Sequence, residues 1–217
     1  MHRRTLGLVA LLASLAACTH DATKTTATVP FEDDFDRATL GENWSHYGGD
    51  WVIDKGAVYS IYAINIPLFL NAELPPDVVV EVDVMSESGD VDSKIELMTD
   101  GKRHESGYIF ILGGWSNSLS CIARMDEHGR DRKVKQPTGV NGNKWYRWRV
   151  EKKGGDIRWL IDGQPYLAFS DDEPLDGPGH DRLAFNNWEN KIRFDNLKIW
   201  PYGQAPGATT STRSAKP

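Results

Sequence analysis

Apolar and polar residues alternate with a period of two along most of the chain. Within residues 78–85, 94–97 and 146–151 every second side chain is apolar, which is typical of strands that bury one face. Between two further apolar runs stands Asp162-Gly163, which predicts a tight two-residue hairpin. After the amino-terminal segment, no long window has the periodicity of an amphipathic helix. The pattern predicts an all-β domain, a two-sheet antiparallel sandwich of jelly-roll type.

The last predicted strand changes its inward parity. Ile192 and Phe194 share one parity, whereas Leu197 and Ile199 share the other, so one extra residue lies at Asp195-Asn196. Such an insertion predicts a β-bulge, and bulges often direct a side chain toward a ligand.

The amino terminus is typical of a secretory signal covering residues 1–17. Two arginines precede a short apolar stretch, and small residues precede Cys18. The stretch Leu15-Ala16-Ala17-Cys18 resembles the bacterial lipobox, which implies that Cys18 is lipidated and anchors the chain to a membrane of the cell envelope. Thr19, in place of Asp, favours the outer membrane. The alternative is a signal peptide that carries this cysteine by coincidence.

Composition divides the remaining chain and excludes one class of partner. Residues 18–29 form the lipidated cysteine and a polar tether, residues 30–202 the jelly-roll domain, and residues 203–217 a polar, disordered tail. The formal net charge of −6 argues against nucleic acid. Once Cys18 carries lipid, Cys121 has no disulfide partner, and its alternation with apolar neighbours predicts a core position.

Several motifs resemble the concanavalin A-like lectin and glucanase superfamily. They are the acidic opening Phe31-Glu32-Asp33-Asp34-Phe35-Asp36, the hairpins at residues 51–56 and 159–163, and the closing strand at residues 194–199. The resemblance covers roughly residues 31 to 200. Relatives with this layout include laminin-G-like domains, family 16 glycoside hydrolases and 3-keto-disaccharide hydrolases, so it implies the fold more firmly than any one activity.

The candidate catalytic residues are Glu81 and Asp83. They lie two residues apart on one predicted strand, so they share a face, as do the acids of family 16 hydrolases. The third acid of that family has no counterpart, because Met85 and Ser86 stand in its place and Glu87 follows too late. The alternative is a pair of solvated acids on the outer face of a valine-rich strand.

Two loops combine a tryptophan with amides, a pairing that suits sugars. Indole rings stack on the C–H faces of a sugar, and amides donate to and accept from its hydroxyls. The alternative is that the indole rings pack at the ends of the sandwich and the amide side chains form hydrogen bonds with the backbone of the turns. The predicted ligand-binding residues are Trp115, Asn117, Arg124, Asn187, Trp188 and Glu189.

Asp33, Asp34 and Asp195 are candidate ligands for a structural calcium ion. Many modules of this fold hold Ca²⁺ between the first and last strands, and calcium prefers hard oxygen ligands. The alternative is that these acids only cap loops. The spacings of zinc sites are absent from the sequence.

These observations leave three hypotheses. The first is a surface-anchored lipoprotein whose jelly-roll domain binds a polysaccharide or other glycan through the two tryptophan loops. The second is a glycan-cleaving hydrolase or lyase that uses Glu81 or Asp83, and the third is a non-catalytic structural protein of the envelope.

Overall fold

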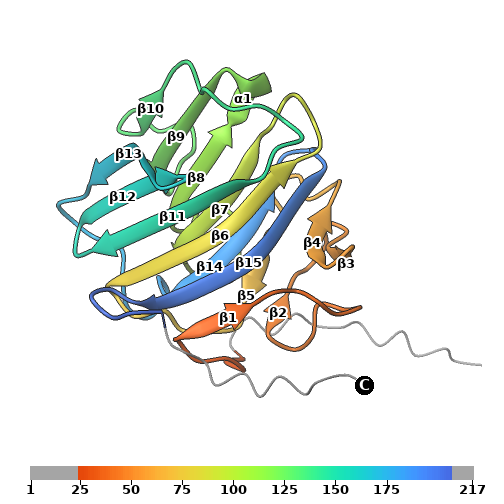
Figure 1. The fold of residues 1–217 in the computed structure, drawn as a ribbon. Helices are drawn as coiled ribbons and strands as arrows, with labels where there is room; N and C mark the ends of the chain where they lie inside the picture. Colours follow the sequence, from red (N-terminus) through yellow and green to blue (C-terminus); the bar gives the residue numbers. More distant parts are fainter. Residues whose placement is uncertain (1–23, 207–217) are drawn as a thin grey trace, which may run out of the picture.

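The computed structural model describes residues 24–206. This part of the chain is all β apart from one helical turn, and its two antiparallel sheets face each other (Figure 1). The predicted two-sheet jelly-roll sandwich is confirmed. Across residues 24–206, no helix has the length and apolarity needed to cross a membrane. The predicted signal segment and Cys18 lie outside the described residues.

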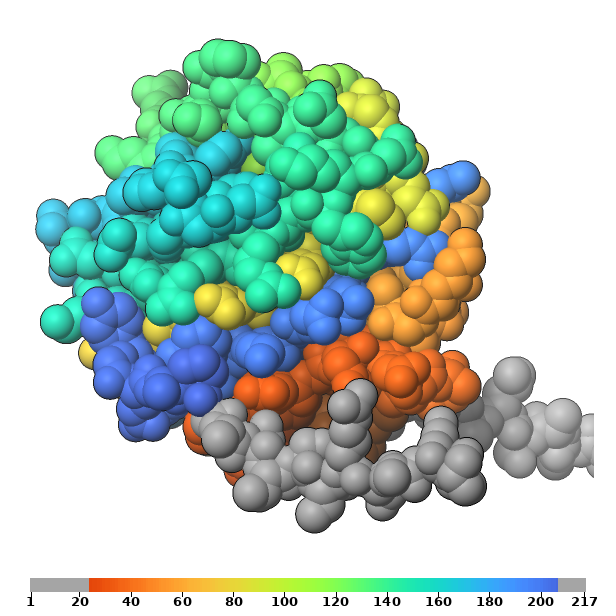
Figure 2. All heavy atoms as spheres, viewed as in Figure 1, coloured from red at the N-terminus to blue at the C-terminus, as the bar shows by residue number. Residues whose placement is uncertain are grey.

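The first sheet has eight strands and lies toward the viewer in Figure 1. Its strands run in the order β13 (Gln164–Ser170), β12 (Asp156–Ile161), β11 (Tyr146–Lys153), β6 (Val78–Ser86), β15 (Ile192–Pro201), β4 (Ala57–Ser60) and β3 (Val52–Asp54), with β1 (Phe31–Asp33) also paired to β15. Figure 2 looks onto the outer face of this sheet, where β11, β6 and β15 cross the molecule diagonally.

The second sheet has seven strands, and the helical turn α1 (Gly114–Asn117) joins two of them. Their order is β10 (Lys133–Lys135), β9 (Leu119–Arg124), β8 (Tyr108–Gly113), β7 (Ser93–Thr99), β14 (Arg182–Asn187), β5 (Leu68–Leu70) and β2 (Trp44–Ser45). Because β7, β8 and β14 are neighbours, the loops at their ends lie close together.

The core lies between the sheets and follows from the alternation. In β6, the inward residues Val80, Val82 and Val84 are buried, while Glu81 and Asp83 point outward. The rings of Phe185 in β14 and Phe194 in β15 stack across the interface at 4.2 Å between centroids. Aromatic pairs of this kind add about 0.5–1.5 kcal/mol beyond the area they bury.

Two local predictions are also confirmed. The pairing of β15 with β6 shifts register between Asp195 and Lys198, which is the predicted bulge. Asp162 and Gly163 join β12 to β13 with φ angles of 50° and 75°, as a two-residue hairpin turn requires.

The outer face of the seven-stranded sheet is buried as well. Ile109, Ile111, Cys121 and Ala123 form a second apolar cluster there, packed against Trp115. Cys121 is thus a buried free thiol, as predicted, but it belongs to this outer cluster and not to the central core. Beside the cluster, Lys94 and Glu96 of β7 alternate outward between the core residues Ile95 and Leu97.

Candidate functional site

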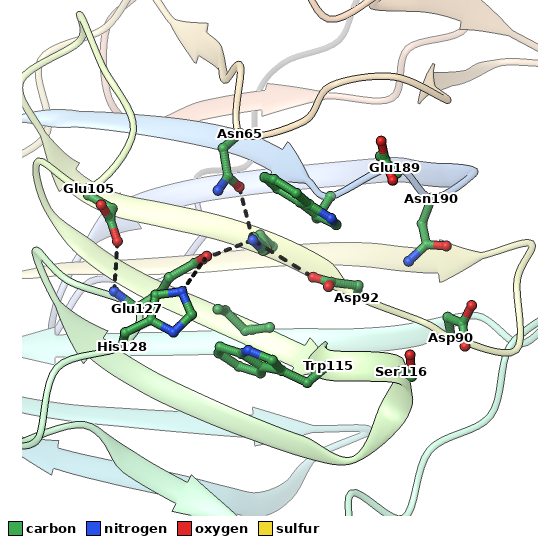
Figure 3. A pocket seen from close by; sticks show the side chains of 13 residues that line it. Asn65, Asp90, Asp92, Glu105, Trp115, Ser116, Glu127, His128, Glu189 and Asn190 are labelled. Carbon is green, nitrogen blue, oxygen red and sulfur yellow. Dashed lines mark hydrogen bonds and ion pairs between the residues drawn. The ribbon is translucent and has the colours of Figure 1, made fainter.

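A pocket of about 660 Å³ opens on this outer face of the seven-stranded sheet (Figure 3). Its floor is formed by Lys94 of β7 and Ile111 of β8. Its walls come from α1, from the loop before β7, from the loop after β9, and from the segments that hold Asn65 and Trp188. The pocket therefore gathers residues that are far apart in the sequence.

Trp115 enters the pocket wall on a left-handed turn. Gly113, Trp115 and Ser116 have φ angles of 66°, 51° and 55°. A side chain at Gly113 would place its Cβ 2.6 Å from that of Val91, so only glycine fits there. The Asn117 amide donates to Val140 O at 2.9 Å and holds the turn against the loop before β11.

The Trp115 ring is further fixed by cationic and aromatic neighbours. The guanidinium carbon of Arg132 lies 4.9 Å from its centroid, and the His128 ring meets it edge-on at 5.5 Å. Arg132 also donates to Glu127 O at 2.6 Å. Such packing presents the indole in one orientation.

Trp188 forms a second wall and is 47% exposed. Its loop is held by the Asn187 amide, which donates to Asn190 O at 2.7 Å, and by the Asn65 backbone N–H, which donates to Asn187 O at 2.9 Å. Glu189 follows in the same wall. The loop is therefore positioned by backbone contacts while the indole stays open to solvent.

Lys94 supplies a buried ammonium group at the floor. Its side chain is only 3% exposed, and Nζ donates to Asn65 Oδ1 at 2.9 Å and to Glu127 Oε2 at 2.8 Å. Burial of an unpaired ammonium is strongly unfavourable, so these two acceptors stabilise its charge.

A second cation, His104, lies behind Glu127. Its Nδ1 is 2.7 Å from Glu96 Oε1, which also accepts from the Asn186 amide at 2.7 Å. Burial opposes the charged ring, but the carboxylates of Glu127 and Glu96 outweigh burial and raise the pKa of His104 to about 9. Burial likewise disfavours charge on Glu127, yet His104 and Lys94 lower its pKa to about 2.

Asp92 is a pocket acid whose charged form is disfavoured by burial. Burial raises its pKa to about 6, against an opposing effect of Lys94. Its Oδ1 lies 3.9 Å from Lys94 Nζ, which is too far for a hydrogen bond, and this buried atom has no hydrogen-bond partner. The pocket thus combines two indoles, a lysine whose charge is paired, and a carboxylate with one buried oxygen that no hydrogen bond satisfies.

The structure brings three of the sequence-predicted binding residues together at the pocket, namely Trp115, Trp188 and Glu189. Asn117 and Asn187 support the two loops from behind. Arg124 lies elsewhere, near the end of β13, where its Nε donates to Asp171 Oδ2 at 2.8 Å.

Glu81 and Asp83 lie on the outer face of the other sheet, away from the pocket. Asp83 accepts two hydrogen bonds from Arg147, each of 2.7 Å, and Glu81 accepts one of 2.7 Å from Arg149. Both carboxylates are therefore engaged by arginines of the neighbouring strand β11.

The predicted calcium ligands are partly occupied by protein groups. Asp33 forms a bidentate ion pair with Arg37 and accepts from Trp44 Nε1 at 2.9 Å, while Asp34 accepts from the backbone N–H of Asp36 at 3.1 Å. In the described range, no group of three or more His, Cys, Asp or Glu side chains is arranged to hold a metal ion. The carboxylates of Asp33 and Asp34 both act on Asp195 and help to raise its pKa, after burial as the main cause, and calcium binding stays a prediction.

Sequence reasoning missed the floor of the pocket. Lys94 and Glu96 are charged at outward positions of β7, whereas the outward positions of neighbouring β8 are Ile109 and Ile111. The sequence did contain a signal for this floor. An outward charged pair on one strand lies beside a strand whose outward residues are apolar, which indicates that a loop covers this face and buries the charges.

Comparisons with known proteins agree with this fold. No family model matches the chain. An extracellular exo-α-L-arabinofuranosidase of Streptomyces chartreusis is 24% identical over 177 residues, which is 78% of this chain and 21% of that protein. The chain therefore spans about a fifth of the length of the curated relative it matches.

Two solved structures define the class of fold. The carbohydrate-binding module CBM66 from Bacillus subtilis superposes with a TM-score of 0.61 at 17% identity, covering 76% of this chain and 97% of the module. A family 16 endo-β-1,3(4)-glucanase superposes with a TM-score of 0.54 at 12% identity, covering 78% of this chain and 89% of the glucanase chain. The described domain therefore has a jelly-roll fold, and one carbohydrate-binding module and one glucanase have a similar fold.

Proposed function

We propose that the protein binds a carbohydrate in the pocket between Trp115 and Trp188. The observation that carries the proposal is the convergence of these two indoles, from separate loops, on a pocket with a hydrogen-bonding floor. Ligand pockets combine apolar walls with a few placed polar groups in this manner. The similarity to a carbohydrate-binding module supports the same function.

Calorimetry with a panel of oligosaccharides, chosen from a glycan array, tests this site. Trp115→Ala and Trp188→Ala should each weaken binding about tenfold, because each removes a stacking surface. Trp145→Ala is the matched control, since Trp145 is 40% exposed and lies outside the pocket. Binding that survives both pocket substitutions unchanged would remove the site.

A second candidate function is glycan cleavage, which the separated pKa values of two pocket acids favour. Asp92 retains its proton to about pH 6, whereas Glu127 is ionised above about pH 2. Glycosidases pair a protonated with an ionised carboxyl group. The test is release of reducing ends from neutral polysaccharides, abolished by Asp92→Asn. In the same assay, Glu81→Gln and Asp83→Asn test the sequence-predicted catalytic pair.

We further propose that the protein acts outside the cytoplasm, attached to the envelope by a lipid on Cys18. The sequence features at residues 1–18 and the extracellular relative support this location. Metabolic labelling with a radioactive fatty acid should mark the wild-type chain and not Cys18→Ala. Fractionation of the envelope then tests the outer membrane against the inner membrane.

A further inference from the structure

The pocket described above carries an excess of negative charge. Its described lining includes five carboxylates and a single lysine or arginine, Lys94. The acids are Asp90, Asp92, Glu105, Glu127 and Glu189. His128 is the remaining titratable side chain of the lining, and its Nε2 lies 3.7 Å from Glu127 Oε1.

The two cations near the pocket floor, Lys94 and His104, are paired with acids other than Asp92. Lys94 donates to Glu127 and Asn65, and His104 lies between Glu96 and Glu127. These contacts balance two carboxylates with two cations. They leave Asp92 without a directly bonded counter-ion.

Asp92 is distinguished from the other pocket acids by an unmet acceptor. Among the lining residues, it alone has a buried side-chain oxygen without a hydrogen-bond partner. The groups facing it are Lys94 at 3.9 Å, Glu127, Asp90 and the backbone N–H of Trp115. In Figure 3, Asp90, Glu189 and Asn190 lie toward the same end of the pocket as Asp92. A ligand group that reaches this end meets several carboxylates, among them that of Asp92, whose side chain is 13% exposed.

We propose that the sugar bound here carries a free ammonium group, as in a glucosamine-containing saccharide, and that this ammonium donates to Asp92. The inference rests on the proposed carbohydrate-binding function and names its ligand class. An ammonium supplies both the missing donor and the missing positive charge, whereas a hydroxyl supplies only the donor. A carboxylated or sulfated sugar would meet repulsion from the same acids.

The test compares two saccharides that differ only at nitrogen. A β-1,4-linked glucosamine trisaccharide and its fully N-acetylated counterpart are titrated calorimetrically into the wild-type chain at about pH 6.5, where Asp92 is mostly ionised. The amine form should bind about tenfold more tightly. Its affinity should fall toward pH 5, as Asp92 gains a proton, while that of the acetylated form stays nearly constant.

Asp92→Asn should remove the preference for the amine and leave the acetylated saccharide nearly unaffected. Asp36→Asn is the matched control, because it removes one exposed carboxylate far from the pocket lining. A melting curve of each variant reports folding, and the wild-type comparison of the two saccharides needs no variant.

The outcomes separate this inference from the proposed function. If the acetylated saccharide binds as tightly as the amine, in a Trp115-dependent manner, the amine inference is wrong and the binding function stands. If Asp36→Asn weakens amine binding as much as Asp92→Asn does, the attraction is only to an acidic surface and the inference again fails. If neither saccharide binds and the glycan array finds no ligand, both proposals fail.

Discussion

The ammonium group of Lys94 lies 2.8 Å from Oε2 of Glu127, and both side chains are at least nine-tenths buried. The pair joins β7 to the loop after β9 across 33 residues of sequence. Because β7 is central to its sheet, this contact fixes the covering loop, and with it Arg132 and Trp115, over the second apolar cluster.

Replacing one member of this pair should destabilise the protein strongly. Lys94→Met leaves the buried Glu127 without its hydrogen-bonded ammonium, and we expect the free energy of unfolding to fall by about 3 kcal/mol. Urea unfolding followed by tryptophan fluorescence measures the change. Lys198→Met is the matched control: its side chain is 43% exposed and its Nζ lies 3.9 Å from Glu32 Oε2, so its loss should change stability by less than about 0.5 kcal/mol. Equal effects of the two substitutions would contradict a structural role for the buried pair.

His104 should make stability depend on pH in the alkaline range. The folded protein holds the pKa of His104 at about 9, above the ordinary value of 6.5. Its charged form therefore stabilises the fold fully below about pH 6.5, and this contribution is lost as the pH rises through 9. We expect the wild-type free energy of unfolding to be about 3 kcal/mol lower at pH 9.5 than at pH 6.

His104→Gln should flatten that pH profile. Glutamine keeps a donor toward Glu96 but does not titrate, so the difference between the two pH values should largely disappear. His128→Gln serves as the control, because the His128 side chain is 65% exposed. A His104→Gln profile as steep as that of the wild type would assign the titration to another group.

Gly113 should be irreplaceable for the orientation of Trp115. In Gly113→Ala the new Cβ would lie 2.6 Å from Val91 Cβ and 2.7 Å from Asn117 Oδ1, at a φ of 66°. We expect a loss of about 2–3 kcal/mol in stability, with weaker sugar binding because the turn shifts. Gly163→Ala, at a φ of 75° in open space, should lose only about 1 kcal/mol and keep sugar binding. Thermal melting of both variants measures the loss of stability, and calorimetry measures sugar binding.

Local patterns allowed much of the fold to be predicted. The alternation in β6, the bulge at Asp195 and the hairpin at Asp162-Gly163 each depend on near neighbours in the sequence, so a single chain was sufficient to find them. The sequence also singled out Trp115 and Trp188 as ligand-binding residues, and the structure places both in the lining of one pocket.

The electrostatic floor of the pocket could not be predicted in the same way. Glu127 meets Lys94 only because the loop after β9 folds back over β7, and Asn65 reaches the same ammonium from a distance of 29 residues. Period-two alternation determines which face a side chain takes, but not what covers that face. For the same reason, Glu81 and Asp83 were placed correctly on one face of β6, while their engagement by arginines of β11 required the sheet order.

Cys121 should be unreactive in the folded protein. Burial raises the pKa of its thiol to about 12, and its side chain is fully buried beside Ile109, Ile111 and Ala123. In Cys18→Ser, which leaves Cys121 as the single cysteine of the sequence, a thiol-specific dye should label less than about a tenth of the native protein within an hour and all of it in urea. Lys94→Met offers a matched comparison in the same background, because loosening of the covering loop should expose Cys121 and accelerate labelling. Fast labelling of the Cys18→Ser protein without denaturant would show that the second apolar cluster opens readily, and the prediction that Cys121 is unreactive would then be wrong.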